Sequence, residues 1–275
     1  MALREGFARA PGGVSILPFM DQTPIYNQMN FNGSFGGGLS AANAFTGNTF
    51  LSGLLVSAYR CPSSTLNPFD EGVYTFTDPN NGTTYSGNYN NPGRGMHIQY
   101  VGISGGAGPA ATISWTPQGG YYDCQRGYSC DNGLLMQNET RSVRDATDGT
   151  SNTMLVGEQS GRLFGANVTS NYYGGWHGAR RTWIASNTAQ CQAPGERDHW
   201  QTGTTCLRQP PNSRGLTDAG SRTIFHNNTT LTSEHSGGLL ALLADGAVRF
   251  LSNNIDFQTY KKLAICADGQ VIGEF

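Results

Sequence analysis

Two apolar segments near the C-terminal end of the chain flank an Asp-Gly pair. Residues 239–244 are Leu-Leu-Ala-Leu-Leu-Ala, residues 247–251 are Ala-Val-Arg-Phe-Leu, and Asp245-Gly246 lies between them. This pattern predicts a β-hairpin, because glycine adopts the positive φ angle of a type I′ turn without steric cost. If Asp245 and Gly246 are the two loop residues, Leu243 faces Val248 across the hairpin. The first segment is apolar on both faces, so we expect it to be an interior strand.

A helical pattern follows the hairpin. Asn253-Asn254 ends the second strand, and Asp256 is a suitable helix N-cap. Apolar residues then recur at helical spacing, at Phe257, Tyr260, Leu263 and Ala264. We therefore predict a helix over residues 256–267, ended by Asp268-Gly269 and packed on the sheet that contains the hairpin.

The rest of the pattern indicates a β-rich α+β fold. Residues 14–28 predict short helical turns interrupted by proline. Five more strands are predicted where apolar and β-branched residues alternate, at residues 72–77, 96–102, 113–115, 133–137 and 153–158. Residues 161–223 lack clear strand patterns and are interpreted as a loop-rich insertion. We predict one domain over residues 1–275, with a mostly antiparallel sheet and the C-terminal hairpin at its centre.

Composition favours an extracellular protein with a polar but weakly charged surface. Glycine occurs 38 times in 275 residues and charged residues make up 13%, about twice and half of ordinary usage (~7% and ~25%). The net charge of −2 gives no electrostatic reason to expect nucleic acid or an anionic membrane as a partner. No apolar segment approaches the ~20 residues that span a bilayer, and residues 1–6 do not resemble a signal peptide. We expect a chain without a membrane segment, whose export signal or anchor was removed or never present.

Six cysteines suggest disulfide bonds. The two close pairs in loop-like sequence are Cys124 with Cys130 and Cys191 with Cys206. Each bond would stabilise the fold by ~2–3 kcal/mol on a loop-entropy estimate. Neither pair has the Cys-x-x-Cys spacing of zinc or redox motifs. Cys61 and Cys266 remain, and a third bond between them is an open alternative. Disulfides indicate an extracellular or cell-surface location, with the periplasm as the alternative.

Several short motifs occur in a characteristic order. They are Ile16-Leu17-Pro18-Phe19-Met20-Asp21-Gln22, Cys61-Pro62-Ser63, Asp148-Gly149-Thr150-Ser151-Asn152-Thr153, Gly157-Glu158, and His235 nine residues before Asp245-Gly246. In this order they resemble the pilin-like proteins expanded in planctomycetes, which are largely of unknown function and carry a C-terminal signature of His, nine residues and Asp-Gly. The resemblance covers nearly the whole chain except residues 161–223.

The resemblance implies a pilin-like globular domain. Members of that family usually begin with a prepilin leader and a long apolar helix, as type IV pilins and type II secretion pseudopilins do. This sequence has neither, so we expect it to be the globular part alone, trimmed or naturally shortened. Ser64 stands where an acidic residue often follows Cys-Pro-Ser, which weakens the case for a metal at that position.

The segment Asp148–Asn152 has the composition of a side-chain-bonded turn. Asp148, Ser151 and Asn152 can bond nearby backbone groups, while Gly149 takes the strained backbone angle. A calcium site with Asp148 and Asn152 as ligands is the alternative, because pseudopilins can bind calcium in comparable loops. The spacing does not fit an EF-hand, and we favour the turn.

No catalytic constellation is predicted. His235 with Asp245, or with Glu158, suggests metal or acid–base chemistry, but the hairpin register separates His235 from Asp245 by the length of a strand. We expect His235 to lie near Asp256, in a hydrogen bond that joins hairpin to helix. Residues 102–106 match the nucleophile-elbow pattern G-x-S-x-G, but glycines and a proline follow where an elbow requires a helix.

An aromatic segment in the insertion is the remaining candidate for binding. If exposed, Tyr172, Tyr173, Trp176 and His177 could stack on sugar rings or bury against a neighbouring subunit. A local core beneath a long loop is the other interpretation. The sequence therefore predicts a non-enzymatic, self-assembling pilin-like or pseudopilin-like subunit, with a glycan- or solute-binding module as the alternative. No cofactor is expected apart from the calcium alternative.

Overall fold

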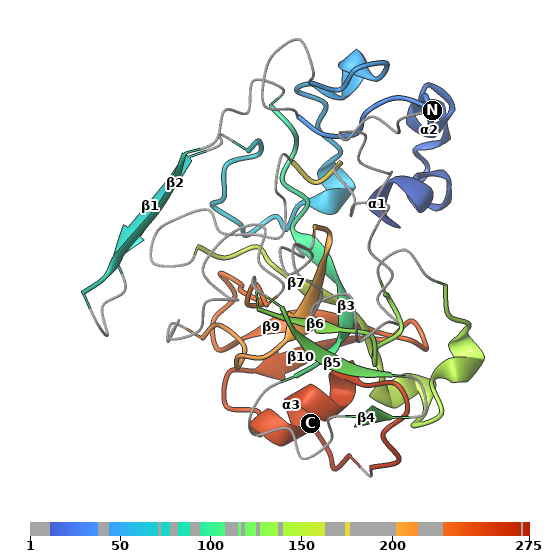
Figure 1. The fold of residues 1–275 in the computed structure, drawn as a ribbon, viewed down its shortest axis with the longest axis vertical. Coiled ribbons are helices and arrows are strands. Elements are labelled where there is room, and N and C mark those ends of the chain that lie inside the picture. Colours follow the sequence, from blue (N-terminus) through green and yellow to red (C-terminus); the bar gives the residue numbers. More distant parts are fainter. Residues whose placement is uncertain are drawn as a thin grey trace.

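A computed structural model of the chain contains one mixed sheet and two smaller ones (Figure 1). It describes residues 12–37, 44–70, 73–77, 82–88, 94–107, 115–116, 119–124, 127–136, 140–162, 174–176, 202–213, 228–270 and 272–275. The helices are α1 (Gly12–Ser15), η1 (Leu17–Met20), α2 (Thr23–Asn27), η2 (Thr49–Leu51), η3 (Ser57–Tyr59), η4 (Val143–Asp145), η5 (Thr150–Asn152) and α3 (Phe257–Ala264). The strands are β1 (Val73–Thr77), β2 (Thr84–Asn88), β3 (Tyr100–Gly106), β4 (Trp115–Thr116), β5 (Gly119–Cys124), β6 (Gly127–Cys130), β7 (Met154–Glu158), β8 (Thr204–Leu207), β9 (Gly238–Leu243) and β10 (Val248–Ser252). Among the described residues, no helix has both the length and the apolar character needed to cross a bilayer.

The main sheet has the strand order β10-β9-β7-β3-β8. Its pairs are antiparallel except β3 with β8, which is parallel. Helix α3 packs on this sheet, and Tyr260 and Leu263 of α3 share one buried core with Leu239, Ala241 and Leu243 of β9. The predicted β-rich α+β fold with a C-terminal helix on the sheet is therefore confirmed. Strand β9 is interior as expected, whereas β10 is an edge strand.

The predicted hairpin register is wrong by one residue. Val248 pairs with Leu242, not with Leu243, and the loop contains three residues ending at Gly246, whose φ is 90°. The Asp245 side chain accepts a hydrogen bond from the Ala247 backbone N–H at 2.8 Å, a contact that stabilises this longer turn. Because side chains alternate between faces, the shift exposes Val248.

Helix α3 begins as predicted and ends early. The Asp256 side chain accepts a hydrogen bond from the Thr259 backbone N–H at 2.8 Å, which is a standard N-cap contact. The helix ends at Ala264 because Ile265 is extended and the Cys266 N–H donates to the Asn132 carbonyl. A tertiary contact therefore removes the last predicted turn.

The insertion contributes a strand to the main sheet. Strand β8 lies at residues 204–207, beside β3, within the region interpreted as loop.

Cys206 of β8 is bonded to Cys130 at the end of β6, so the predicted bonds of Cys130 with Cys124 and of Cys206 with Cys191 are wrong. Cys191 itself lies outside the described residues. Cys61 and Cys266 are buried free thiols, so the third bond is not formed. The disulfide therefore joins cysteines that the packing of the strands brings together, and not those that are close in the sequence.

A second core lies at the N-terminal end of the molecule, away from α3 (Figure 1). Val14 and Leu17 of the predicted short helical turns are buried there with Met96 and Trp176. The predicted strand at residues 96–102 begins only at Tyr100, because the His97 and Gln99 backbone N–H groups donate to the Pro68 and Tyr59 carbonyls, outside the main sheet. Residues 133–135 of another predicted strand form bends, and its last residue, 137, lies outside the described residues. The β1–β2 hairpin projects to one side (Figure 1).

Candidate functional site

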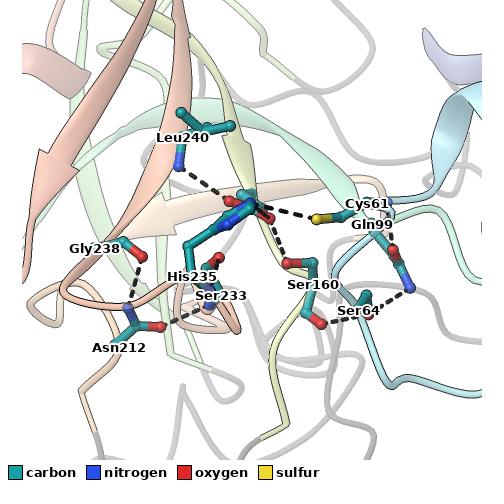
Figure 2. Close-up of polar contacts among 10 residues, drawn as sticks. Cys61, Ser64, Gln99, Ser160, Asn212, Ser233, His235, Gly238 and Leu240 are labelled. Carbon is teal, nitrogen blue, oxygen red and sulfur yellow. Dashed lines mark hydrogen bonds and ion pairs between the residues drawn. The ribbon is translucent and has the colours of Figure 1, made fainter.

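Three motif residues that are far apart in the sequence meet in the structure. The Cys61 Sγ lies 3.5 Å from the His235 Nε2, and the same nitrogen lies 3.6 Å from the Glu158 Oε1. All three donor atoms lie within 4.8 Å of one another. Figure 2 shows the thiol and the imidazole converging from chain segments 174 residues apart. We call Cys61, Glu158 and His235 the Cys–Glu–His cluster.

Glu158 occupies the point where two strands separate. The last ladder pair between β7 and β9 is Gly157 with Ala241. Beyond it, the Glu158 Oε2 accepts a hydrogen bond from the Leu240 backbone N–H at 3.0 Å, in place of a backbone carbonyl. The Ser160 hydroxyl donates to Oε1. The Glu158 side chain is fully buried, and hydrogen bonds hold both of its carboxylate oxygens.

The Cys61 loop is attached to the sheet through side-chain amides and hydroxyls. The Cys61 backbone N–H donates to the Gln99 side-chain oxygen at 2.7 Å, and the Gln99 Nε2 donates to the Ser64 hydroxyl at 2.9 Å. That hydroxyl donates to the Ser160 carbonyl. Ser64 therefore joins the Cys61 loop to the segment after Glu158 (Figure 2).

His235 is the member of the cluster that reaches solvent, with 32% of its side chain exposed. Its backbone N–H donates to the Ser233 hydroxyl at 3.0 Å, and the Ser233 N–H donates to the Asn212 side chain at 2.7 Å. The Asp256 side chain instead accepts hydrogen bonds from Thr259, so the predicted contact of His235 with Asp256 is wrong.

Asp245 lies in the hairpin loop, at the opposite end of β9 from His235. The predicted separation of the two signature residues is therefore correct. In the structure His235 lies beside Glu158. From the sequence alone, this pair is only an alternative to His235 with Asp245.

The cluster does not have the arrangement of a catalytic triad. In a triad the two imidazole nitrogens engage different partners, one the nucleophile and the other the acid. Here Nε2 alone faces both the thiol and the carboxylate. Burial raises the pKa of the Cys61 thiol and the nearby Glu158 raises it further, so the thiol is not an activated nucleophile. Burial is also the main cause that raises the pKa of Tyr100, with smaller contributions from Cys61 and Glu158.

Sulfur, nitrogen and carboxylate oxygen that converge on one point are a metal-ligand set. Cysteine, histidine and glutamate in combination suit zinc and similar transition metals better than calcium. Ser64 is not part of this donor set, because its hydroxyl is hydrogen-bonded to Gln99 and Ser160.

The Asp148 segment forms a turn bonded by its own side chains. The Asp148 carboxylate accepts the backbone N–H groups of Asp268 at 2.6 Å and Gly269 at 2.9 Å. The Asn152 amide donates to the Asp148 carbonyl, and Gly149 has a φ of 102°. Ser151 lies exposed in η5. Because the Asp148 oxygens already accept hydrogen bonds and Asn152 acts as a donor, these contacts favour the turn over the calcium site.

The aromatic segment is described only in part. Tyr172, Tyr173 and His177 lie outside the described residues. Trp176 is fully buried, with its ring edge-on to Tyr59 at a centroid distance of 6.2 Å. Trp176 therefore belongs to the N-terminal core and offers no surface for a sugar.

The G-x-S-x-G match lies inside β3. Ser104 is fully buried, and its hydroxyl donates to the Thr205 carbonyl at 3.1 Å. The strand continues through residues 105 and 106, so the sharp turn of a nucleophile elbow is not formed.

Sequence reasoning missed the residues that position the cluster. Gln99 and Ser160 carry the contacts that orient Cys61 and Glu158. Neither belongs to a recognisable motif. The signal in the sequence was Glu158 at the end of a predicted strand. A buried carboxylate requires hydrogen-bond donors nearby, so polar neighbours could have been expected.

No curated protein sequence and no solved structure matches the chain significantly. A family model described as "Protein of unknown function (DUF1559)" matches residues 7–258. The matched region includes Cys61, Glu158 and His235 together with the C-terminal hairpin. The chain therefore belongs to the DUF1559 family of proteins of unknown function.

Proposed function

We propose that the protein is a non-catalytic structural subunit that acts outside the cytoplasm and assembles with copies of itself. Its motif order resembles the pilin-like proteins of planctomycetes. The Cys130–Cys206 disulfide supports an oxidising location, at the cell surface or beyond it.

The observation that carries the assembly proposal is the exposed edge of the main sheet. Strand β10 pairs only with β9 in the described part of the chain. Its Val248 and Phe250 side chains are 62% and 50% exposed. An edge strand presents unpaired backbone N–H and C=O groups, and proteins usually protect such edges with charges, proline or bulges. In β10, Arg249 is the single charged residue.

The edge is apolar on the face opposite α3. Val248 pairs with Leu242 and Phe250 with Leu240, so these four side chains lie on one face of the hairpin. We call them the β10 edge patch. Antiparallel pairing of β10 with the same strand of a second copy would extend the sheet through a two-fold interface and bring the patches of the two copies side by side.

Such a two-fold contact closes on itself, so a filament requires a second surface. Phe19 of η1 is 88% exposed, and the N-terminal helices lie at the end of the molecule away from β10 (Figure 1). We therefore assign dimerisation to β10 and further assembly to the Phe19 region.

Analytical ultracentrifugation over a wide concentration range tests the assembly. Wild type is expected to form dimers and larger species. Val248→Lys and Phe250→Lys are expected to lose the β10 dimer and the larger species that need both contacts, and Phe19→Lys is expected to stop at dimers. Val143→Lys is the matched control, because Val143 is 59% exposed but lies in η4. A wild type that stays monomeric, or edge variants that assemble like wild type, would overturn the proposal.

The second candidate is a glycan- or solute-binding module. It rests on Tyr172, Tyr173 and His177, because the buried Trp176 ring cannot stack on a ligand. A glycan array and a thermal-shift screen with the full chain would detect such a ligand. Binding that is lost in Tyr172→Ala and Tyr173→Ala variants favours this candidate, and a complete absence of ligands removes it.

A further inference from the structure

We propose that Cys61, Glu158 and His235 form a binding site for one divalent transition metal of the zinc class. The three residues supply one sulfur, one oxygen and one nitrogen donor, and the site opens to solvent on the His235 side. This site is independent of the β10 edge patch, so either proposal can fail without the other.

Two of the three donor separations in the cluster match those between ligands of one ion, and all three donors lie within 4.8 Å of one another. Zinc binds sulfur at ~2.3 Å and imidazole nitrogen or carboxylate oxygen at ~2.0–2.2 Å, in tetrahedral geometry. Those bond lengths place S and N about 3.6 Å apart and N and O about 3.4 Å apart. The observed separations are 3.5 Å between Cys61 and His235 and 3.6 Å between His235 and Glu158.

The distance between His235 and Glu158 is long for a direct hydrogen bond, whereas 3.5 Å between the Cys61 Sγ and the His235 Nε2 lies within the range of a hydrogen bond to sulfur. A nitrogen-to-oxygen hydrogen bond spans ~2.7–3.2 Å, and a contact at 3.6 Å is outside that range. The His235 Nε2 is therefore close to the Glu158 Oε1 without bonding to it. An ion between the donors would account for the convergence of all three groups and for the long His235–Glu158 distance.

The charge balance of the cluster also favours a cation. Glu158 is fully buried, and a buried carboxylate without a compensating charge is unfavourable. Within the described residues, His235 is the only basic side chain in ion-pair distance of Glu158. A bound divalent cation would neutralise both the carboxylate and a Cys61 thiolate.

Surrounding hydrogen bonds already hold the donor groups in place. Leu240 and Ser160 orient the carboxylate, and Gln99 holds the backbone of Cys61. Partners of this kind fix ligand orientation in metal sites and increase metal affinity. Three protein ligands leave the fourth tetrahedral position to water or another small ligand, as in open zinc sites.

Cobalt(II) titration of the purified, chelator-treated full chain tests the site. Cobalt replaces zinc in such sites and gives a thiolate-to-metal charge-transfer band only when sulfur is a ligand. Wild type is expected to bind one Co²⁺ per chain with this band, and Zn²⁺ is expected to abolish the band by displacing cobalt. Cys61→Ser should lose the band, and His235→Gln and Glu158→Gln should bind at least tenfold more weakly.

Two controls separate ligation from folding. Cys266→Ser removes the other buried free thiol and should leave cobalt binding unchanged. Circular dichroism without metal should show that His235→Gln is folded, and zinc should raise the Tm of wild type but not of this variant. The proposal is overturned if wild type binds no stoichiometric cobalt, if Cys61→Ser keeps the band, or if Cys266→Ser removes it.

Discussion

Replacement of Glu158 by leucine should destabilise the protein through two buried hydrogen-bond donors. Leucine has a similar volume but no acceptor, so it leaves the Leu240 backbone N–H and the Ser160 hydroxyl without the partner they have in the wild type. Each buried donor left unsatisfied costs about 1–3 kcal/mol. Leucine recovers part of this loss because it is apolar. The expected net loss is about 3 kcal/mol of the free energy of unfolding.

Glu158→Gln removes the negative charge but keeps one acceptor oxygen, so it separates the effect of the charge from that of the hydrogen bonds. Its amide oxygen can still accept from the Leu240 N–H, so the expected loss is about 1 kcal/mol. Glu234→Gln is the surface control, because Glu234 is exposed and accepts long contacts from Thr65 and Arg162 at 3.3 and 3.2 Å. It should change the free energy of unfolding by less than about 0.5 kcal/mol.

Urea unfolding with chelator present, at neutral pH, measures these differences without a contribution from bound metal. The expected order of stability is wild type, then Glu158→Gln, then Glu158→Leu. A leucine variant as stable as wild type would refute the argument that the Glu158 carboxylate replaces missing strand pairing between β7 and β9.

Three further predictions concern other parts of the fold. Non-reducing peptide mapping should recover a peptide cross-linked through Cys130 and Cys206. The variant with both cysteines replaced by serine should lose about 4 kcal/mol of the free energy of unfolding, given the 76-residue separation. A different partner for Cys206 would contradict the strand arrangement. Burial, with a smaller contribution from the nearby Asp148, raises the pKa of Asp268 from 3.8 to about 6. The folded state thus favours the protonated acid, and this group's contribution to stability falls as pH rises from about 4 to 6. Asp268→Asn should therefore be more stable than wild type by about 1 kcal/mol at pH 7, after allowance for partial exposure, and equally stable below pH 4. Urea unfolding of both proteins across this pH range measures the difference in the free energy of unfolding. A difference that does not change with pH would contradict the raised pKa of Asp268. Gly133→Ala should lower the free energy of unfolding by about 3 kcal/mol, because the new Cβ would lie 2.6 Å from the backbone of residues 104 and 105. In the control Gly273→Ala, the new Cβ meets no atom within 4 Å, so urea unfolding should show no change.

Local elements were predictable because their signals are local. The Asp256 cap and the apolar spacing of α3 act within one or two turns, and the helix forms where they predict it. The interior position of β9 followed from its apolar character on both faces. The hairpin register was missed because the Ala244 and Asp245 N–H groups donate to the distant carbonyls of Thr153 and Thr150. Those contacts stabilise a three-residue loop that the Asp-Gly pair alone does not specify.

The Cys–Glu–His cluster was not predicted from the sequence, although its residues stand in motifs. Cys61, Glu158 and His235 each belong to a short motif, and the sequence separates the outer two by 174 residues. Their meeting depends on β7 lying between β3 and β9 and on the Cys61 loop being held by Gln99 and Ser64. No periodicity in the chain encodes that arrangement.

The sequence by itself determined the fold class, the hairpin, the C-terminal helix and the short N-terminal turns, because caps, turn residues and hydrophobic periodicity act between neighbouring residues. Tertiary structure alone decided that β8 joins the sheet beside β3, that Cys206 bonds Cys130, and that His235 meets Glu158 and Cys61. The physical reason is the same in each case. A partner in a disulfide, a parallel ladder or a ligand cluster is the group that packing brings within bonding distance, and packing is a property of the whole chain.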